Sequence, residues 1–354
     1  GVAQPSWTWR VVLPVGISFY TFQSLGYTID VYRRHIEPCR DPVAFLAFVS
    51  FFPQLVAGPI ERASHLLPQF LQTRIIRLAD VEAGFWLVLW GLFKKVVVAD
   101  QLAPVVELAF DRGAPSGPLL LVGTFAFAGQ IYGDFSGYSD VARGLAQALG
   151  FDLMRNFDRP YASANVREFW RRWHISLSTW IRDYLYVPLG GNRGSEARVT
   201  LNLLVTFLVA GLWHGASWNF VLWGVWHGLA LAVHRAWSRR PGSALPVVAG
   251  RVLTLLTVGY GWLLFRAVAP GSLVRLHGGL LAWSAPAWIA EVAIVAIVWS
   301  VPLLVAESDW GRRLSPTTFA RLPAFARGTV AGLVVLGLAA YWERDAVPFI
   351  YFQF

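Results

Sequence analysis

The sequence predicts an all-α protein that crosses a membrane several times, with re-entrant or interfacial helices between its spans. Of its 354 residues, 56% are hydrophobic and only 14% are charged. Apolar windows of bilayer length or more, with few or no charges, cover residues 197–234, 247–265, 284–306 and 326–342. A soluble fold with this composition would expose too much apolar surface, so the composition excludes an ordinary water-soluble domain.

The N-terminal part is predicted to hold two membrane segments and one surface helix. Residues 9–29 and 43–60 are apolar enough to form the two membrane segments. Residues 61–80 mix three arginines with apolar side chains, which favours a helix lying in the membrane interface.

Residues 82–110 are hydrophobic but contain the pair Lys94 and Lys95. The pair leaves two arrangements open: the end of one helix followed by a second short helix, or one segment whose lysines snorkel. Residues 118–133 begin as an apolar helix and run into the polar stretch YGDFSGYSD at 132–140. Hydrocarbon does not tolerate such a stretch, so we expect it to be buried in protein or to line a cavity.

The segment 152–198 is the least apolar part of the chain. Its basic and apolar residues recur at helical spacing, which predicts an amphipathic or re-entrant helix at the cytoplasmic face. Residues 199–212 and 217–236 then flank a Trp-His-Gly triplet, and we expect a hairpin of half-length or tilted helices there. Further spans are predicted at 252–267, 284–306 and 328–342.

The formal charge of +9 is interpreted as an excess of basic residues in cytoplasmic loops between the apolar segments, as the positive-inside rule expects. Arginines gather at 235–251 and 312–327, which places both loops on the same side as 152–198 and leaves the C-terminal Phe354 outside. No aromatic and basic module typical of nucleic-acid binding is visible, so nucleic acid is not an expected partner. The expected partner is membrane lipid.

His214 is the strongest catalytic candidate because it lies in GLWHGASWN at 211–219, between two apolar arms. An ionisable side chain at membrane depth is costly, and its presence there indicates function. Trp213 is expected to wall a pocket beside it. The alternative is a core histidine satisfied by one hydrogen bond. His227 repeats the Trp-His-Gly pattern without polar flanks and is expected to pack inside a continuing helix.

His174 lies in FWRRWHISLSTWIRDY at 169–184, beside Arg171, Arg172 and Arg182. Arginine binds phosphate through two parallel hydrogen bonds, so Arg171 and Arg172 are predicted to bind an anionic cofactor or carrier. The alternative is an interfacial helix that touches anionic lipid headgroups. Asp134 and Ser136 are candidates for substrate binding, with the capping and linking of buried helices as the alternative.

Several reaction classes lack their motifs in this chain. There is no G-x-S-x-G, no phosphate-binding glycine loop and no H-E-x-x-H, and Cys39 is the only cysteine, so no metal site is predicted. A histidine without a serine nucleophile or a metal suits a general base that activates a hydroxyl for attack on an activated acyl group. A thioester donor is expected because the leaving group must be a good one.

Ordered runs along the chain resemble the bacterial membrane-bound O-acyltransferase (MBOAT) family, and most closely its alginate O-acetyltransferase branch. The teichoic-acid D-alanyl transfer proteins are close relatives of that branch. The matching runs are FYTFQSLGYTIDVYRR (19–34), FFPQLVAGPIER (51–62), DFSGYSD (134–140), FWRRWHISLSTWIRDYLYVPLGGNR (169–193), GLWHG (211–215) and FIYFQF (349–354).

The resemblance implies a single domain over residues 1–354, with helices arranged around a central funnel. It places the family's invariant histidine on His214 and its second histidine on His174. It implies no tightly bound cofactor, and an acyl donor that is acetyl-CoA or an acyl carrier. Members usually begin with further helices before the region matching Gly1, so the chain is expected to lack the N-terminal helices of the family.

The function expected from this resemblance is acetyl transfer across the bacterial inner membrane for O-acetylation of an exported polysaccharide such as alginate. An extracellular or periplasmic acetyltransferase partner is expected to complete the reaction. The alternatives are D-alanyl or other acyl transfer to teichoic acid, lipid or protein, and a transporter or channel in which His214 lines a permeation path.

Overall fold

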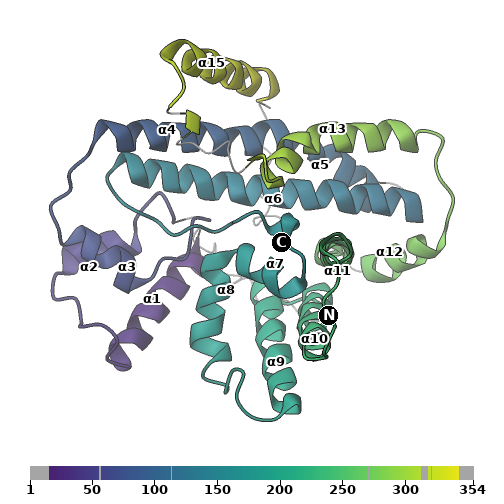
Figure 1. Ribbon diagram of the computed structural model, residues 1–354, viewed down its shortest axis with the longest axis horizontal. Coiled ribbons are helices and arrows are strands. Elements are labelled where there is room, and N and C mark those ends of the chain that lie inside the picture. Colours follow the sequence, from purple (N-terminus) through teal and green to yellow (C-terminus); the bar gives the residue numbers. More distant parts are fainter. Residues whose placement is uncertain are drawn as a thin grey trace, which may run out of the picture.

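The protein is helical throughout the parts that the computed structural model describes, which are residues 16–55, 57–112, 114–269, 271–311, 318–319 and 321–342. No strand occurs in these ranges. Figure 1 shows α4, α6 and α13 running across the molecule, with α8 and α9 roughly perpendicular to them. The prediction of an all-α fold is therefore confirmed.

One layer is built on the pairing of α4 with α6. It contains a continuous helical run of α4 (Leu78–Leu92), the π-helix η1 (Phe93–Ala99), α5 (Asp100–Glu107) and the π-helix η2 (Leu108–Arg112). Against this run lie α6 (Gly117–Ala148), α13 (Ile289–Glu307) and α15 (Ala324–Tyr341).

The second group of helices carries both candidate histidines. Its members are the 3₁₀ turn η3 (Pro160–Ala162), α7 (Val166–Arg172), α8 (Ile175–Ile181), the π-helix η4 (Arg182–Tyr186), α9 (Glu196–His214), α10 (Trp218–Ser238), α11 (Val247–Arg266) and α12 (Ser272–Leu281). The remaining helices, α1 (Ile17–Tyr32), α2 (Pro42–Val49) and α3 (Ala63–Phe70), form a cluster at one side in Figure 1.

Glycines let α4 and α6 approach closely. A Cβ atom on Gly91 would lie 2.5 Å from the carbonyl oxygen of Gly137, and one on Gly84 would lie 2.4 Å from that of Gly144. Helices in membranes associate through such small residues because the hydrophobic effect does not drive them together in lipid.

Lys94 and Lys95 are held inside this pair of helices. The ammonium group of Lys94 lies 2.7 Å from a carboxylate oxygen of Asp140, and that of Lys95 lies 3.0 Å from Asp134. Residues 78–112 are one uninterrupted helical run, and Lys94 is 4% exposed. The lysines thus neither break the segment nor snorkel, because Asp140 and Asp134 on α6 supply counter-charges and Asp100 on α5 lies 2.8 Å from the Lys95 ammonium group. The polar stretch at 132–140 is largely buried in protein, as predicted.

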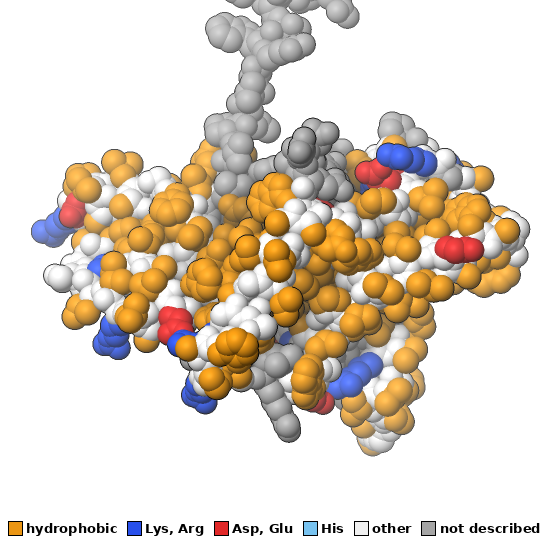
Figure 2. Space-filling model, turned by 90° about the horizontal axis from the view of Figure 1, so that it is seen from above, with side chains coloured by type: hydrophobic (Ala, Val, Ile, Leu, Met, Phe, Trp, Pro, Cys, Tyr) orange, Lys and Arg blue, Asp and Glu red, His pale blue; other side chains and the backbone are white. Residues whose placement is uncertain are grey.

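Four described helices are long and apolar enough to cross a membrane: α9, α11, α13 and α15. They match the four apolar windows of the sequence. Figure 2 shows hydrophobic side chains over most of one face, with charged side chains in a few separate places. In Figure 1, α11 is seen end on while α13 runs across the view, so these two candidate spans cross steeply.

Two predicted segments differ from the structure. The described residues within 43–60 do not form one long helix, because α2 has 8 residues and ends at Val49, after which the chain turns. The hairpin around His214 is not built of half-length helices, since α9 has 19 residues and α10 has 21. A tilted hairpin stays a prediction, as does the cytoplasmic side of 152–198. Phe354 lies outside the described residues.

Candidate active site

His174 lies at a sharp turn between two short helices. Asn165 caps the first of them, α7, because its side-chain oxygen accepts a hydrogen bond from the backbone N–H of Glu168 at 2.9 Å. Trp173 then leaves the helix with an extended backbone, and His174 takes the left-handed conformation with φ 42° and ψ 57° before α8 begins. The amphipathic helix predicted within residues 152–198 is therefore broken, and the break is at His174.

His214 is the last residue of α9, where the chain turns into α10. Close packing of the two helices fixes this turn: a Cβ atom on Gly224 would lie 2.3 Å from the carbonyl oxygen of Phe207. The imidazole of His214 is surrounded by aromatic rings. Its ring centroid lies 4.8 Å from that of Trp213, 5.2 Å from Trp223 and 5.0 Å from Phe265.

The fold brings both histidines to one cavity of about 770 Å³. Trp213 lies beside both rings, with its centroid 6.5 Å from that of His174 and 4.8 Å from that of His214. His174 is 2% exposed, and neither of its ring nitrogens has a hydrogen-bond partner in the described part of the chain. A buried imidazole in this state is able to bond to a molecule that enters the cavity.

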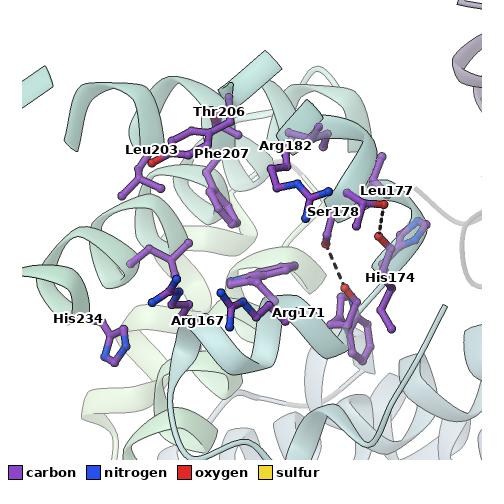
Figure 3. A pocket seen from close by; sticks show the side chains of 18 of the residues that line it. Arg167, Arg171, His174, Leu177, Ser178, Arg182, Leu203, Thr206, Phe207 and His234 are labelled. Atoms are coloured by element: carbon purple, nitrogen blue, oxygen red, sulfur yellow. Dashed lines mark hydrogen bonds between the residues drawn. The ribbon is translucent and has the colours of Figure 1, made fainter. Parts of the chain in front are cut away.

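Basic side chains line the other part of this cavity. They are Arg167, Arg171, Arg182, Arg235 and Arg239, and we call them the basic rim. Figure 3 shows Arg167 and Arg171 side by side on α7, with Arg182 across from them. Aromatic residues line the cavity near the histidines, namely Trp173, Trp223, Trp262 and Phe265. The cavity thus joins an anion-attracting rim to an aromatic site with two imidazoles.

The predicted binding residues fall in different places. Arg171 lines the cavity, whereas Arg172 lies 2.6 Å from a carboxylate oxygen of Glu168 and does not line it. Trp213 was expected to wall the pocket, but it packs on both histidines and is not among the residues that line the cavity. Asp134 and Ser136 bond to the lysines of η1 and lie outside the lining; the Lys94 ammonium group is 2.9 Å from the Ser136 hydroxyl.

Four members of the basic rim were not predicted to bind substrate: Arg167, Arg182, Arg235 and Arg239. Arg167 and Arg171 are four residues apart, which puts them on the same side of α7, so helical spacing could have identified Arg167. Arg235 and Arg239 were interpreted only as loop charges. Nothing in the sequence places the end of α10 next to α7.

Of the other histidines, His234 also lines the cavity, beside Arg167, whereas the following three have structural neighbours. His227 is 1% exposed and packs between Trp170 and Trp223, at ring-centroid distances of 4.9 and 5.0 Å, as expected of a residue inside a helix. A ring nitrogen of His65 lies 2.7 Å from a carboxylate oxygen of Glu61. A hydrogen bond of 2.8 Å joins a ring nitrogen of His277 to the hydroxyl of Tyr260. Among the described residues, no group of three or more His, Cys, Asp or Glu side chains could hold a metal ion.

Similarity to known proteins covers most of the chain. Residues 33–267 match the model of the membrane-bound O-acyltransferase family. The chain is 46% identical over 260 residues to a protein of Azotobacter vinelandii named "Probable alginate O-acetylase AlgI", a match that covers 73% of this chain and 52% of the relative.

Two further relatives act on other acceptors by name. A peptidoglycan O-acetyltransferase of Helicobacter pylori is 36% identical over 77% of this chain and 58% of its own length. A teichoic acid D-alanyltransferase of Streptococcus thermophilus is 29% identical over 64% of this chain and 58% of its own. The chain spans about half the length of the curated relatives it matches.

Proposed function

Since this chain belongs to the membrane-bound O-acyltransferase family, we propose that it transfers an acyl group, first of all acetyl, from a thioester donor to a hydroxyl acceptor. The observation that carries the proposal is the single cavity that joins the basic rim to His174 and His214. A thioester donor with a phosphorylated carrier needs both the basic rim and the two histidines, because the phosphates lie at one end of such a donor and the reacting carbonyl at the other.

The donor is acetyl-CoA or an acyl carrier, and the basic rim is its docking region. Planar guanidinium groups bind phosphate through parallel hydrogen bonds, and a cluster of them attracts an anionic carrier from a distance. Arg167 and Arg171 are exposed, so they are free to meet a ligand that arrives from solvent.

The acceptor hydroxyl is activated by His214. A ring nitrogen of the neutral imidazole takes the hydroxyl proton as the hydroxyl oxygen bonds to the thioester carbonyl carbon. The carbon–sulfur bond then breaks, and the thiolate that leaves receives the proton from His214. The products are an ester and a free thiol, and the histidine returns to its starting state.

His174 acts beside it, on the donor. Its ring nitrogens have no partner in the described protein, and the Trp213 ring lies next to both imidazoles. An imidazole N–H placed there donates to the thioester carbonyl oxygen, where negative charge develops. The aromatic walls exclude water, which would otherwise hydrolyse the donor.

The proposed acceptor is a hydroxyl of an exported polysaccharide such as alginate, reached through a partner acetyltransferase outside a bacterial inner membrane. Two of the relatives above are named for O-acetyl transfer to glycan hydroxyls, which supports a sugar acceptor. D-alanyl transfer to teichoic acid is the second candidate, since a relative at 29% identity bears that name.

Release of free thiol from labelled acetyl-CoA tests the proposal. The natural full-length protein in vesicles, with its polysaccharide acceptor present, should release thiol and acetylate the glycan at matching rates. Movement of an intact solute across the vesicle membrane without thiol release would instead favour the transporter reading. Preference for a D-alanyl carrier over acetyl-CoA would favour the second candidate.

A further inference from the structure

The backbone of His174 is held in a conformation that L-residues rarely adopt. Among the described residues other than glycine, only Arg34, Arg159 and His174 have positive φ. Arg34 is exposed and Arg159 half-buried, whereas His174 is 2% exposed. A residue with a Cβ atom pays free energy for this conformation, so neighbouring contacts must maintain it.

Asn156 makes those contacts. Its backbone carbonyl oxygen accepts a hydrogen bond from the backbone N–H of Ile175 at 2.8 Å. Its side-chain oxygen accepts from the Ser176 hydroxyl at 2.6 Å and from the Ser176 backbone N–H at 3.4 Å. Both residues that follow His174 are therefore bonded to one asparagine, which is 1% exposed.

Two further bonds tie this arrangement to other parts of the fold. The side-chain NH₂ of Asn156 donates to the Ser139 hydroxyl on α6 at 3.1 Å. The backbone N–H of Ile60 donates to the Ser176 hydroxyl at 2.9 Å. Asn156, Ser139 and Ser176 are all buried, and water does not compete for these bonds. The turn at His174 is thus held by segments far apart in the sequence.

We propose that Asn156 is a positioning residue for His174: it keeps the turn in its left-handed conformation and so keeps the imidazole against the cavity. The functional part rests on the proposed acyl transfer, in which His174 contacts the donor. Asparagine suits this place because its amide both accepts from Ser176 and donates to Ser139. Asn156 itself does not line the cavity.

Thiol reactivity tests the positioning without any assay of activity. In a full-length protein whose Cys39 and any cysteine outside residues 1–354 are replaced by serine, His174→Cys provides a single thiol at the turn, and its rate of alkylation by a small maleimide is measured with and without Asn156→Ala. We expect the rate to rise by about fivefold or more, because the released turn samples open conformations.

His214→Cys is the matched control, since it also faces the cavity but is held by α9. Its alkylation rate should stay unchanged by Asn156→Ala. An equal rise at both positions would mean general loosening, and no rise at His174→Cys would mean that Asn156 does not hold the turn; either result overturns the proposal. Ser176→Ala removes one of the same bonds and serves if Asn156→Ala fails to insert.

The activity arm separates this inference from the proposed function. With His174 intact, Asn156→Ala and Ser176→Ala should each lower kcat for acyl transfer by roughly tenfold, with KM for the donor unchanged, because neither residue lies at the basic rim. Unchanged kcat in both variants would overturn the functional part. An unaltered protein that transfers no acyl group, but shows the selective change in thiol reactivity, would refute the proposed function and leave the positioning intact.

Discussion

His214 and His227 both contact the ring of Trp223, with centroid distances of 5.2 and 5.0 Å, yet only His214 lines the cavity. Both belong to a Trp-His-Gly triplet. They differ because α9 ends at His214, whereas His227 lies inside α10, where Trp170 covers it. The sequence motif is therefore the same and the chemical setting is not.

This difference predicts the outcome of replacing each histidine. His214→Ala should lower acyl transfer by about a hundred- to ten-thousand-fold, because the general base is lost. His174→Ala should be impaired less, and His227→Ala should keep measurable activity. Transfer of labelled acetyl by the full-length protein is the measurement, with normal membrane insertion checked for all three. Full activity of His214→Ala would refute the assignment.

The two neighbouring arginines of α7 are expected to behave differently. Arg171→Gln should raise KM for the donor roughly tenfold with little change in kcat, which is the loss of about one charge-assisted hydrogen bond. Arg172→Gln is the matched control, because Arg172 is paired with Glu168 and does not line the cavity. Steady-state kinetics with varied donor distinguish them. Equal donor dependence in the two variants would contradict the role of the basic rim.

The pair of Glu61 and His65 predicts a pH dependence of stability. The hydrogen bond to Glu61 raises the pKa of His65 above its ordinary value of 6.5, and burial raises the pKa of Glu61. The folded protein thus binds more protons than the unfolded chain. The stabilisation from His65 is complete below its ordinary pKa and is lost as the pH rises through its folded pKa.

The unfolding midpoint of the purified protein should therefore fall as the pH rises above about 6.5, the ordinary pKa of histidine. In Glu61→Gln, this fall should be smaller because His65 loses the partner that raises its pKa. Thermal unfolding followed by tryptophan fluorescence in detergent measures both. A slope that is equal in the two proteins would show that this pair does not set the dependence.

The close approach of α4 and α6 predicts a sharp effect of one methyl group. Gly91→Ala should destabilise the protein by about 1–3 kcal/mol, since the new Cβ would meet the Gly137 carbonyl oxygen at 2.5 Å. Gly332→Ala in α15 is the control, because nothing lies within 4 Å of its Cβ position and alanine favours a helix. Thermal midpoints should fall for the first and not for the second.

The basic loops predict that 152–198 faces the cytoplasm. In a Cys39→Ser background, Ser195→Cys should resist an impermeant thiol reagent in intact spheroplasts and react after the membrane is opened. Labelling of Ser195→Cys in intact spheroplasts would show that 152–198 faces the outside and would contradict the predicted orientation.

Hydropathy predicted the four candidate spans well, because each is a long apolar run that is mostly not buried inside the protein. It failed at 43–60, where apolar residues belong to the short helix α2 and to turns. An apolar composition indicates that a segment avoids water, but it does not show whether the segment is one long helix or a short helix followed by turns. Hydropathy also could not decide the fate of Lys94 and Lys95, because Asp140 and Asp134, which pair with them, lie about forty residues further on in α6 and only Asp100 is near in sequence.

The motifs identified His174 and His214, and the fold places both at one cavity. The sequence could not separate Arg171 from Arg172, because successive residues on a helix point about 100° apart and only packing shows which direction faces a cavity. No motif or periodicity in the sequence pointed to Asn156 as a residue that matters for the site. Its importance arises from a backbone conformation at His174 that no periodicity reveals.

The buried pairs of Lys94 with Asp140 and Lys95 with Asp134 constrain how the protein is made. A lysine at the centre of a lone helix costs about 2.5–3.5 kcal/mol to insert, and this helix carries two. Asp140 and Asp134 are synthesised later, on α6, whereas Asp100, the other carboxylate partner of Lys95, belongs to the same helical run. The run that begins with α4 should therefore remain beside the translocon until α6 emerges and neutralises Lys94.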